Sequence, residues 1–422
     1  MTVLMQELRV EKLVQGGEGM ARLSDGRVCF VQGGLPGELC LVQLTQDRKD
    51  FARGRVVKVL EKSVDRVQPQ CPLYGKCGGC SLQHLEESRE AFYLEQVERE
   101  NFRRIAHAEL PDDFRIHRGK SWGYRNRARV LVCRDKSGKV SYGFRMQESN
   151  RVAFIQNCPV LTPALNSFLK ENACKLFEKL EPKGGKYRSR PFELDLNVFD
   201  NGKGKVSYFY RGMPSMEFEK NAMAVVDIAG KKIFSDASVF FQSNLSLLPE
   251  LIESVQHAVD EGIASGEASD AWLIDLFSGV GFFAAFLREK FKRITTVERD
   301  EGCLKHANRN LLQLHDAGEA ETSLAPQIEN VSSPAEEWLS KNVVNVPATL
   351  IVDPPRTGLP SSALEAIIKS SVNRLIYVSC DPVTLARDYS RFSQAGFCLK
   401  RAEGFAFYPR TPHLEMMFVL SR

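Results

Sequence analysis

The hydrophobic and polar positions follow three successive patterns along the chain. Over residues 1–65, short runs rich in β-branched residues, such as LRVEKLV at 8–14 and RVVKVL at 55–60, alternate with turns that contain glycine. Several short strands at this spacing, separated by turn residues, are typical of a small barrel. We therefore predict an N-terminal β-barrel over residues 1–65.

The middle stretch, residues 66–240, begins with clustered cysteines and continues with a helical pattern at 87–110. Beyond this helix, β-rich runs such as ARVLVCR at 128–134 and FELDLNVF at 192–199 are separated by turns. These runs predict strands. We expect a central antiparallel β domain here, and we expect the helix at 87–110 to pack with the domain that follows.

From 241 to 422 the pattern becomes an alternation of strands and helices. The apolar runs LIDLF at 273–277 and LIYVS at 375–379 are typical of strands buried on both faces. Helical stretches such as 282–291 lie between these strands. Alternation of this kind predicts an open sheet with parallel crossovers, that is, a Rossmann-like α/β domain.

A turn with two glycines follows the first of these strands. Gly279 and Gly281 stand between the strand and the next helix, where glycine lets a ligand approach the backbone. The motif differs from that of dinucleotide-binding proteins, because Ala284 occupies the third glycine position. Glu298 ends the next strand, where a carboxylate can accept both ribose hydroxyls. Together these features predict an S-adenosylmethionine site.

The segment TLIVDPPRTGL places Asp353 at the end of a further strand, above the predicted cofactor site. Pro354 and Pro355 stiffen the loop that follows and remove two backbone donors. Enzymes that methylate exocyclic amines carry an aromatic residue after the two prolines. Arg356 stands at that position here, which argues against an exocyclic amine as the methyl acceptor.

Cys380 lies at the tip of another apolar strand, directly before a turn into a helix. Helix N–H donors near such a tip favour the thiolate, so we predict that Cys380 is a nucleophile. Near the C-terminus, Glu415 is the predicted general base, because its apolar neighbours Leu414 and Met416 would raise its pKa. His413 is the alternative base.

A cluster of cysteines in the middle stretch indicates a metal centre. Cys71, Cys77 and Cys80 form a C-x5-C-x2-C pattern, and Cys158, which precedes a proline as Cys71 does, is the expected fourth ligand. Three-plus-one thiolates suit a [4Fe–4S] cluster or a zinc site. Because zinc sites more often use two C-x2-C pairs, the pattern favours the iron–sulfur cluster.

Composition narrows the partners and the compartment. With 57 Lys and Arg against 53 Asp and Glu, the net charge is +4, which permits a polyanionic partner. There is no run of 18 apolar residues and no signal-peptide pattern, and the 11 cysteines fit a reducing environment, so we expect a cytoplasmic protein. Basic residues of the predicted barrel favour nucleic-acid binding: Arg22, Arg27, Lys49, Arg53, Arg55 and Lys58.

These motifs together resemble the RNA uracil-C5 methyltransferases, above all the three-domain, iron–sulfur bacterial enzymes that act on 23S rRNA. The likeness covers nearly the whole chain, and SCDPVTLARD at 379–388 carries it most specifically. It implies a TRAM-type RNA-binding barrel, a Rossmann-like catalytic domain and a [4Fe–4S] cluster on the four cysteines. It also implies cofactor contacts by Gln242, Phe277, Glu298 and Asp353, a nucleophile at Cys380 and a proton acceptor at Glu415.

The resemblance implies a specific chemistry for the thiol. Uracil C5 is a poor nucleophile until a thiolate adds to C6, after which C5 can attack the methyl group of S-adenosylmethionine. A base must then remove the C5 proton so that the cysteine can leave. One position departs from the family pattern, because Phe282 replaces the Asn that often follows the second glycine. We expect the cofactor contact of that Asn to be lost or replaced.

Three other interpretations remain open at this point. The first is a uridine methyltransferase that acts on the T-loop of tRNA, although such enzymes usually lack the barrel and the cluster. The second is an RNA-binding protein with a silent catalytic domain, and the third is a cytosine-C5 methyltransferase. We favour RNA, and rRNA in particular, as the partner of a monomeric enzyme.

Overall fold

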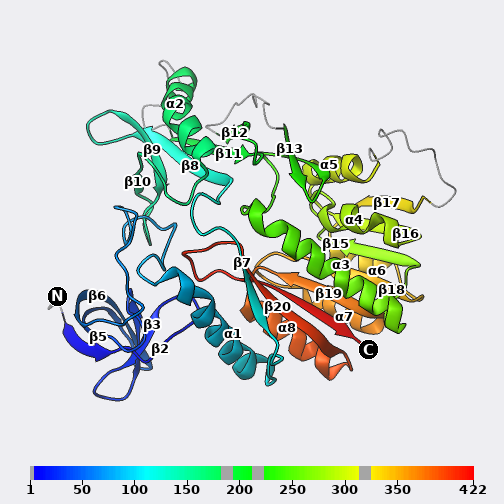
Figure 1. Cartoon of the computed structure of the whole chain (residues 1–422), viewed down its shortest axis with the longest axis horizontal. Coiled ribbons are helices and arrows are strands. Elements are labelled where there is room, and N and C mark those ends of the chain that lie inside the picture. The colour runs from blue at the N-terminus through cyan, green and yellow to red at the C-terminus, as the bar shows by residue number, and fades with distance from the viewer. Residues whose placement is uncertain (1–3, 182–192, 212–222, 313–324) are drawn as a thin grey trace.

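Six short strands near the N-terminus enclose one apolar core. The computed structural model describes residues 4–181, 193–211, 223–312 and 325–422 of the chain (Figure 1). The strands are ordered β1-β5-β6-β4-β3-β2, and all neighbours are antiparallel except the parallel pair β4 and β6. Alternate residues face inward, so Leu8, Val31 and Val42 are buried. The bounds are β1 (Met5–Arg9), β2 (Lys12–Leu13), β3 (Gly19–Arg22), β4 (Val28–Gln32), β5 (Leu39–Asp47) and β6 (Phe51–Glu61).

An antiparallel sheet follows, as the alternating pattern predicts, in the order β10-β9-β8-β11-β12. Helix α2 covers one face, and Leu165, Leu169 and Phe177 on its inner side are buried in the same core as the strands. The side chain of Thr162 caps this helix by accepting a hydrogen bond from the Leu165 N–H at 3.3 Å. The bounds are β8 (Arg127–Arg134), β9 (Val140–Arg145), β10 (Val152–Phe154), α2 (Pro163–Leu180), β11 (Glu193–Asp200) and β12 (Val206–Arg211).

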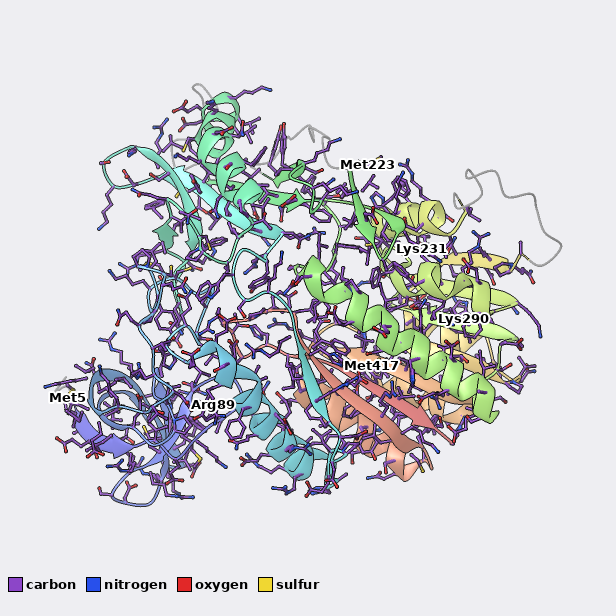
Figure 2. The ribbon with its side chains drawn as sticks, viewed as in Figure 1. Met5, Arg89, Met223, Lys231, Lys290 and Met417 are labelled. Atoms are coloured by element: carbon purple, nitrogen blue, oxygen red, sulfur yellow. The ribbon has the colours of Figure 1, made fainter. Side chains whose placement is uncertain are left out.

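The largest sheet has the order β17-β16-β15-β18-β19-β21-β20-β7, with helices on both faces (Figure 1). The first five strands are parallel, and β21 is antiparallel to both of its neighbours. This arrangement confirms the predicted Rossmann-like domain. Met417 on β21, labelled in Figure 2, is fully buried in one of the two cores. The bounds of the strands are β15 (Trp272–Leu276), β16 (Arg293–Glu298), β17 (Gln327–Ser332), β18 (Ala348–Val352), β19 (Val372–Ser379), β20 (Cys398–Ala406) and β21 (Glu415–Ser421).

Two apolar cores lie on opposite sides of this sheet. Helices α3, α4 and α5 contribute to one core, and α1, α6, α7 and α8 contribute to the other. All five residues of β15 are buried, as expected for a strand covered on both faces. The bounds are α3 (Leu248–Ser265), α4 (Phe282–Leu287), α5 (Glu301–Leu312), α6 (Ala335–Lys341), α7 (Ser361–Lys369) and α8 (Pro382–Gln394).

Two elements of the middle stretch belong to this C-terminal assembly. In α1 (Glu90–Ala106), Phe102 packs against Tyr389 and Phe418 with ring centroids 5.0 and 5.3 Å apart. Strand β7 (Arg115–Arg118) pairs in parallel with β20. Residues before 241 thus contribute to the C-terminal assembly. The domain limits 1–65, 66–240 and 241–422 stay predictions. Among the described helices, none has the length and apolarity needed to cross a bilayer.

Candidate active site

The glycine turn after β15 is wound into left-handed backbone conformations. Phe277, Gly279 and Gly281 have φ angles of 60, 54 and 72°. A left-handed conformation is costly for Phe277, and such strain persists only where the surrounding structure enforces it. Glu298, at the tip of β16, accepts hydrogen bonds from the Gly279 N–H at 3.0 Å and from the Asp300 N–H at 2.8 Å. The two strand tips are thus tied together by one carboxylate.

Two further carboxyl groups lie at neighbouring strand tips. Asp275 is fully buried, and burial raises its pKa to about 8. Its Oδ2 atom accepts a hydrogen bond from the Ala284 N–H at 3.3 Å. Asp353 follows β18 and is half-buried at the wall of a cavity, and desolvation raises its pKa as well. At neutral pH this edge of the sheet therefore carries less negative charge than its carboxyl groups suggest.

A single cavity collects the residues that the sequence assigns to catalysis and cofactor binding. It spans about 2170 Å³, including space open to solvent. The cavity lies at the carboxyl ends of the parallel strands, the usual place for ligands in such sheets. Its lining includes all six predicted residues: Gln242, Phe277, Glu298, Asp353, Cys380 and Glu415.

Cys380 lies between β19 and α8, but the surroundings of its thiol differ from the expected ones. Burial raises its pKa to about 11, the nearby carboxyl groups of Glu415 and Asp353 add to the rise, and Arg356 opposes it. The prediction that helix donors favour the thiolate is therefore wrong for the ligand-free protein. Asp381 caps α8 by accepting a hydrogen bond from the Thr384 N–H at 3.0 Å, so its carboxylate occupies that donor.

Glu415 begins β21 and is buried, with 3% of its surface exposed. Burial raises its pKa, the direction expected from its apolar neighbours, and Asp353 contributes further. The Gln242 Nε2 donates a hydrogen bond to Glu415 Oε2 at 3.2 Å, while the buried Gln242 Oε1 has no partner among the described residues. His413 lines the same cavity but is exposed. The geometry thus favours Glu415 over His413 as the group that takes a proton.

Comparison with known proteins agrees with this geometry. A TRAM-domain family model matches residues 3–57, and a tRNA (Uracil-5-)-methyltransferase family model matches residues 341–422. The 23S rRNA (uracil(1939)-C(5))-methyltransferase RlmD of Chromohalobacter salexigens is 30% identical to this chain, covering 98% of it and 89% of the relative. The RlmD of Shewanella sediminis is also 30% identical, with coverages of 97% and 94%. The chain belongs to the RNA uracil-C5 methyltransferase family.

A solved structure supports the same fold for the whole chain. The tRNA (uracil-54, C5)-methyltransferase of Pyrococcus abyssi, solved in complex with S-adenosyl-L-homocysteine, superposes with a TM-score of 0.72 at 20% identity. The match covers 98% of this chain and 99% of that one. The predicted family, the TRAM domain and the methyltransferase fold are thereby confirmed. The roles of individual residues stay predictions.

The position where this chain departs from its family has an apolar surrounding. Phe282 is 9% exposed, lines the cavity and packs edge-on against Phe241 and Phe286 at centroid distances of 5.9 and 5.3 Å. The cavity wall is therefore aromatic at this position, and whether the expected loss of a cofactor contact occurs stays a prediction. Phe240, which no sequence pattern indicated, is 64% exposed and lines the same cavity. Its place two residues before Gln242 was the available signal.

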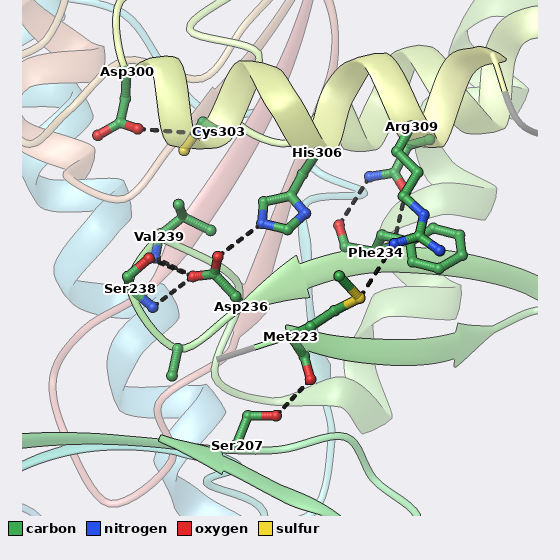
Figure 3. Close-up of polar contacts among 12 residues, drawn as sticks. Ser207, Met223, Phe234, Asp236, Ser238, Val239, Asp300, Cys303, His306 and Arg309 are labelled. Atoms are coloured by element: carbon green, nitrogen blue, oxygen red, sulfur yellow. Dashed lines mark hydrogen bonds and ion pairs between the residues drawn. The ribbon is translucent and has the colours of Figure 1, made fainter. Parts of the chain in front are cut away.

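The turn that leads to Gln242 contacts helix α5 through a partly exposed polar network (Figure 3). Asp236 ends β14 (Lys231–Asp236), the second strand of a hairpin, and its Oδ1 accepts hydrogen bonds from the Ser238 N–H at 2.6 Å and the Val239 N–H at 3.1 Å. Its Oδ2 pairs with the His306 ring at 2.9 Å. The orientation of this cavity wall is thus set by helix α5.

A second cavity collects the four predicted metal-ligating cysteines. Cys71, Cys77, Cys80 and Cys158 all line it, and all are half-buried. The Gly79 N–H donates to the Cys77 sulfur at 3.4 Å, a contact that thiolate ligands commonly accept. Within the described part of the chain, no group of three or more Cys, His, Asp or Glu side chains meets closely enough to hold a metal ion. The four cysteines thus line one space without forming a metal site among the described residues.

Proposed function

We propose that this chain transfers a methyl group from S-adenosylmethionine to C5 of a uridine in RNA, with Cys380 as the nucleophile and Glu415 as the proton acceptor. The placement of Cys380, Glu415 and Glu298 on the wall of one cavity supports the proposal most strongly. The cavity puts a thiol, a buried carboxyl group and a ribose-binding carboxylate within reach of one pair of ligands. The TRAM domain supports RNA as the substrate.

Four residues would hold the cofactor in this proposal. Glu298 is oriented by two backbone N–H groups, and each of its oxygens keeps a lone pair for a ribose hydroxyl. The left-handed turn at Phe277 brings the backbone to the cavity. Gln242 offers its unpartnered Oε1, and Asp353 lines the same cavity. S-adenosylmethionine, when bound, supplies an electrophilic methyl group and a positive charge near the thiol.

The state of Cys380 defines the first chemical requirement. Because its pKa is about 11 without ligands, few molecules carry a thiolate at neutral pH. A positive charge in the cavity lowers the pKa of a neighbouring thiol, as Arg356 already does in part. The thiolate then adds to C6 of the uridine, and the electron pair moves toward C5 and its carbonyl. C5 becomes the nucleophile that accepts the methyl group.

The last step requires a base. After methyl transfer C5 carries both a methyl group and a proton, and the sulfur is still bonded to C6. Glu415 removes that proton, the electron pair restores the C5–C6 double bond, and the thiolate leaves. The Gln242 amide holds the carboxylate by its hydrogen bond to Oε2. A raised pKa makes Glu415 a stronger base than an exposed glutamate once it is ionised.

The relatives favour 23S rRNA as the substrate. The RlmD enzymes of Chromohalobacter salexigens and Shewanella sediminis are named for uridine 1939 of 23S rRNA, and each matches almost the full chain. We propose the equivalent rRNA uridine as the target of a monomeric, cytoplasmic enzyme. The Pyrococcus abyssi tRNA enzyme shares the fold only, at 20% identity.

We further propose that Cys71, Cys77, Cys80 and Cys158 hold a [4Fe–4S] cluster. Each thiolate of such a cluster binds a different iron atom, and the presence of all four cysteines on the wall of one cavity supports the proposal. The C-x5-C-x2-C spacing at 71–80 contains one C-x2-C pair, whereas zinc sites more often use two. The cluster would stabilise the loops that carry the cysteines and support RNA contact.

One experiment tests the reaction and the substrate together. The purified protein is incubated with methyl-labelled S-adenosylmethionine and unmodified 23S rRNA or tRNA, and the RNA is then digested and mapped. We expect label on 5-methyluridine at one site of the rRNA. Label in the T-loop of tRNA would change the substrate. Label on 5-methylcytidine, or none in either RNA, would overturn the proposed function.

A further inference from the structure

Arg410 occupies an unusual place in the loop that joins β20 to β21, residues 407–414. It is the largest fully buried side chain in the described residues, with 1% of its surface exposed. Its φ angle of 66° is left-handed, which is costly for a residue with a Cβ atom. The Arg410 N–H donates to Glu90 Oε1 at 2.6 Å, and its carbonyl accepts from the N–H groups of Ser81 and Leu82 at 3.1 and 3.0 Å. The surrounding structure thus enforces this conformation.

The Arg410 side chain binds the same two segments a second time. One guanidinium nitrogen, Nη2, donates to the carbonyl oxygens of Leu82, at 2.9 Å, and of Leu85. The other, Nη1, pairs with Glu90 Oε2 at 3.1 Å. Trp122 lies beside the guanidinium, with its ring centroid 5.4 Å from the Cζ atom. One residue therefore joins the β20–β21 loop to the 81–85 segment and to the first residue of α1.

The 81–85 segment is itself fixed to the cysteine-bearing loop. The Cys71 N–H donates to the Gln83 side chain at 3.0 Å, and the Tyr74 hydroxyl donates to the Ser81 carbonyl. Gln83 is buried, so the contact to Cys71 is shielded from water. The 81–85 segment thus gives Arg410, and with it the β20–β21 loop, a fixed point of attachment.

Cavity-lining residues flank Arg410 on both sides. Tyr408 lies two residues before it, and His413 and Glu415 follow it within five residues. The neighbouring Pro409 carbonyl accepts a hydrogen bond from the buried Tyr124 hydroxyl at 3.2 Å. Glu415 begins β21, where it pairs with Phe405 of β20, so the loop that leads to it is held by the sheet at its end and by these contacts at 409–410.

We propose that Arg410 is a positioning residue, which holds the β20–β21 loop so that Glu415 reaches the C5 proton of the methylated uridine. This inference rests on the proposed function of Glu415. Without the Arg410 contacts, the loop keeps its covalent link to β21 but loses its fixed position relative to the cavity. Cys380, carried by β19, stays in place. Addition and methyl transfer then continue, while proton removal slows.

The test compares Arg410→Met with Arg374→Met, a matched loss of a buried arginine. Arg374 is 3% exposed and pairs with Glu267 at 2.9 Å, but it lies near the start of β19, at the opposite end from Cys380. Each variant is assayed on unmodified rRNA with labelled S-adenosylmethionine, for kcat, for the KM of RNA, and for protein–RNA adduct that survives denaturing electrophoresis. For Arg410→Met we expect kcat to fall about 10- to 100-fold, as for a small misplacement of a reacting group.

The amount of covalent protein–RNA adduct distinguishes a positioning role of Arg410 from a purely structural role. In Arg410→Met, we expect the adduct to accumulate with its uridine already methylated, and we expect the KM of RNA to change little. Arg374→Met is expected to lower the melting temperature without any adduct. Arg410→Lys retains the charge opposite Glu90 and is expected to restore part of kcat and reduce the adduct.

The outcomes are distinct. If the wild-type protein makes no 5-methyluridine, the proposed function fails, and the inference with it. If the wild type is active but Arg410→Met keeps the wild-type kcat, or loses kcat with no adduct, only the inference fails. If neither Arg410→Met nor Arg410→Lys folds, Arg410 is a structural residue and the inference fails as well.

Discussion

The two cavities that gather the reactive side chains differ in what holds their walls. The methyltransferase cavity is built on the tips of parallel strands, and its key carboxylate, Glu298, is held by backbone N–H groups. The cysteine cavity is lined largely by loops around Cys71, Cys80 and Cys158. The tips of β16 and β19 are expected to keep their place when one side chain is removed, whereas the loops of the cysteine cavity, like the β20–β21 loop, depend on their contacts. Changes in the first cavity should therefore alter chemistry, and changes in the second should alter the fold.

The replacement Cys380→Ala provides the most severe test of the first half of this comparison. Without the thiol, C5 of the uridine is not activated, and we expect turnover to fall at least about 10⁴-fold, as for other lost nucleophiles. The strand tip remains, so the affinity for S-adenosylmethionine should stay close to that of the wild type. Labelled methyl transfer and calorimetric binding measure the two quantities. Cys398→Ala, at an exposed thiol, serves as the control, and residual turnover above a few per cent in Cys380→Ala would refute the assignment.

The replacement Glu415→Gln tests the later step in the same cavity. Gln is nearly isosteric with the protonated acid but accepts no proton, so we expect kcat to fall about 10²- to 10⁴-fold, the usual contribution of general base catalysis. Because addition and methyl transfer precede the lost step, a covalent protein–RNA complex with a methylated uridine should accumulate. Denaturing electrophoresis and mass spectrometry detect it. If His413→Ala produced the complex and Glu415→Gln did not, the two roles would be reversed.

The replacement Cys77→Ser tests the second half of the comparison. Structural metal sites contribute free energy directly to folding, so we expect loss of iron, a lower melting temperature and weaker RNA binding. Affinity for S-adenosylmethionine should change much less, because the first cavity stands on strand tips. Cys174→Ser, at a half-buried thiol on α2 outside the cysteine cavity, is the matched control. Unchanged iron content, stability and RNA affinity in Cys77→Ser would show that the cluster proposal is wrong.

The sequence predicted which residues line the first cavity better than it predicted the protonation state of Cys380. Strand tips follow directly from apolar runs, and parallel strands bring their tips to one edge, so Glu298, Asp353 and Cys380 were placed together without a structure. The ionisation of Cys380 was predicted wrongly, because it depends first on burial of the thiol and then on Glu415, which comes 35 positions later, and on Asp353.

Local motifs reveal little about contacts between distant segments. Arg410 follows no recognisable pattern, and its importance arises from Leu82, Leu85 and Glu90, more than 300 positions earlier in the chain. The packing of the helix at 87–110 on the C-terminal domain was foreseen, but the partners of Phe102 were not. Residues that line a cavity are thus easier to predict than residues that hold its wall.

The smallest expected effect is a gain in the free energy of unfolding of the Glu415→Gln variant. Since the pKa of Glu415 is raised in the folded protein, the folded state keeps a proton that the unfolded chain has already released above about pH 4.5. The unfolded state therefore binds fewer protons in this window, and the free energy of unfolding decreases as the pH rises toward the raised pKa.

Glu415→Gln removes this pH dependence, because the amide never has to lose a proton in a buried place. We expect the variant to match the wild type near pH 5 and to be more stable near pH 8, by about 1 kcal/mol or more. Chemical denaturation at both pH values measures the difference, with the exposed Glu253→Gln as the control. If the variant and the wild type were equally stable at pH 8, Glu415 would be solvated in the free protein. Burial would then no longer explain a raised pKa for the base. A gain of stability in the variant at pH 8 alone would show that burying the Glu415 carboxyl group destabilises the folded protein at that pH. No such cost is expected in the cysteine cavity.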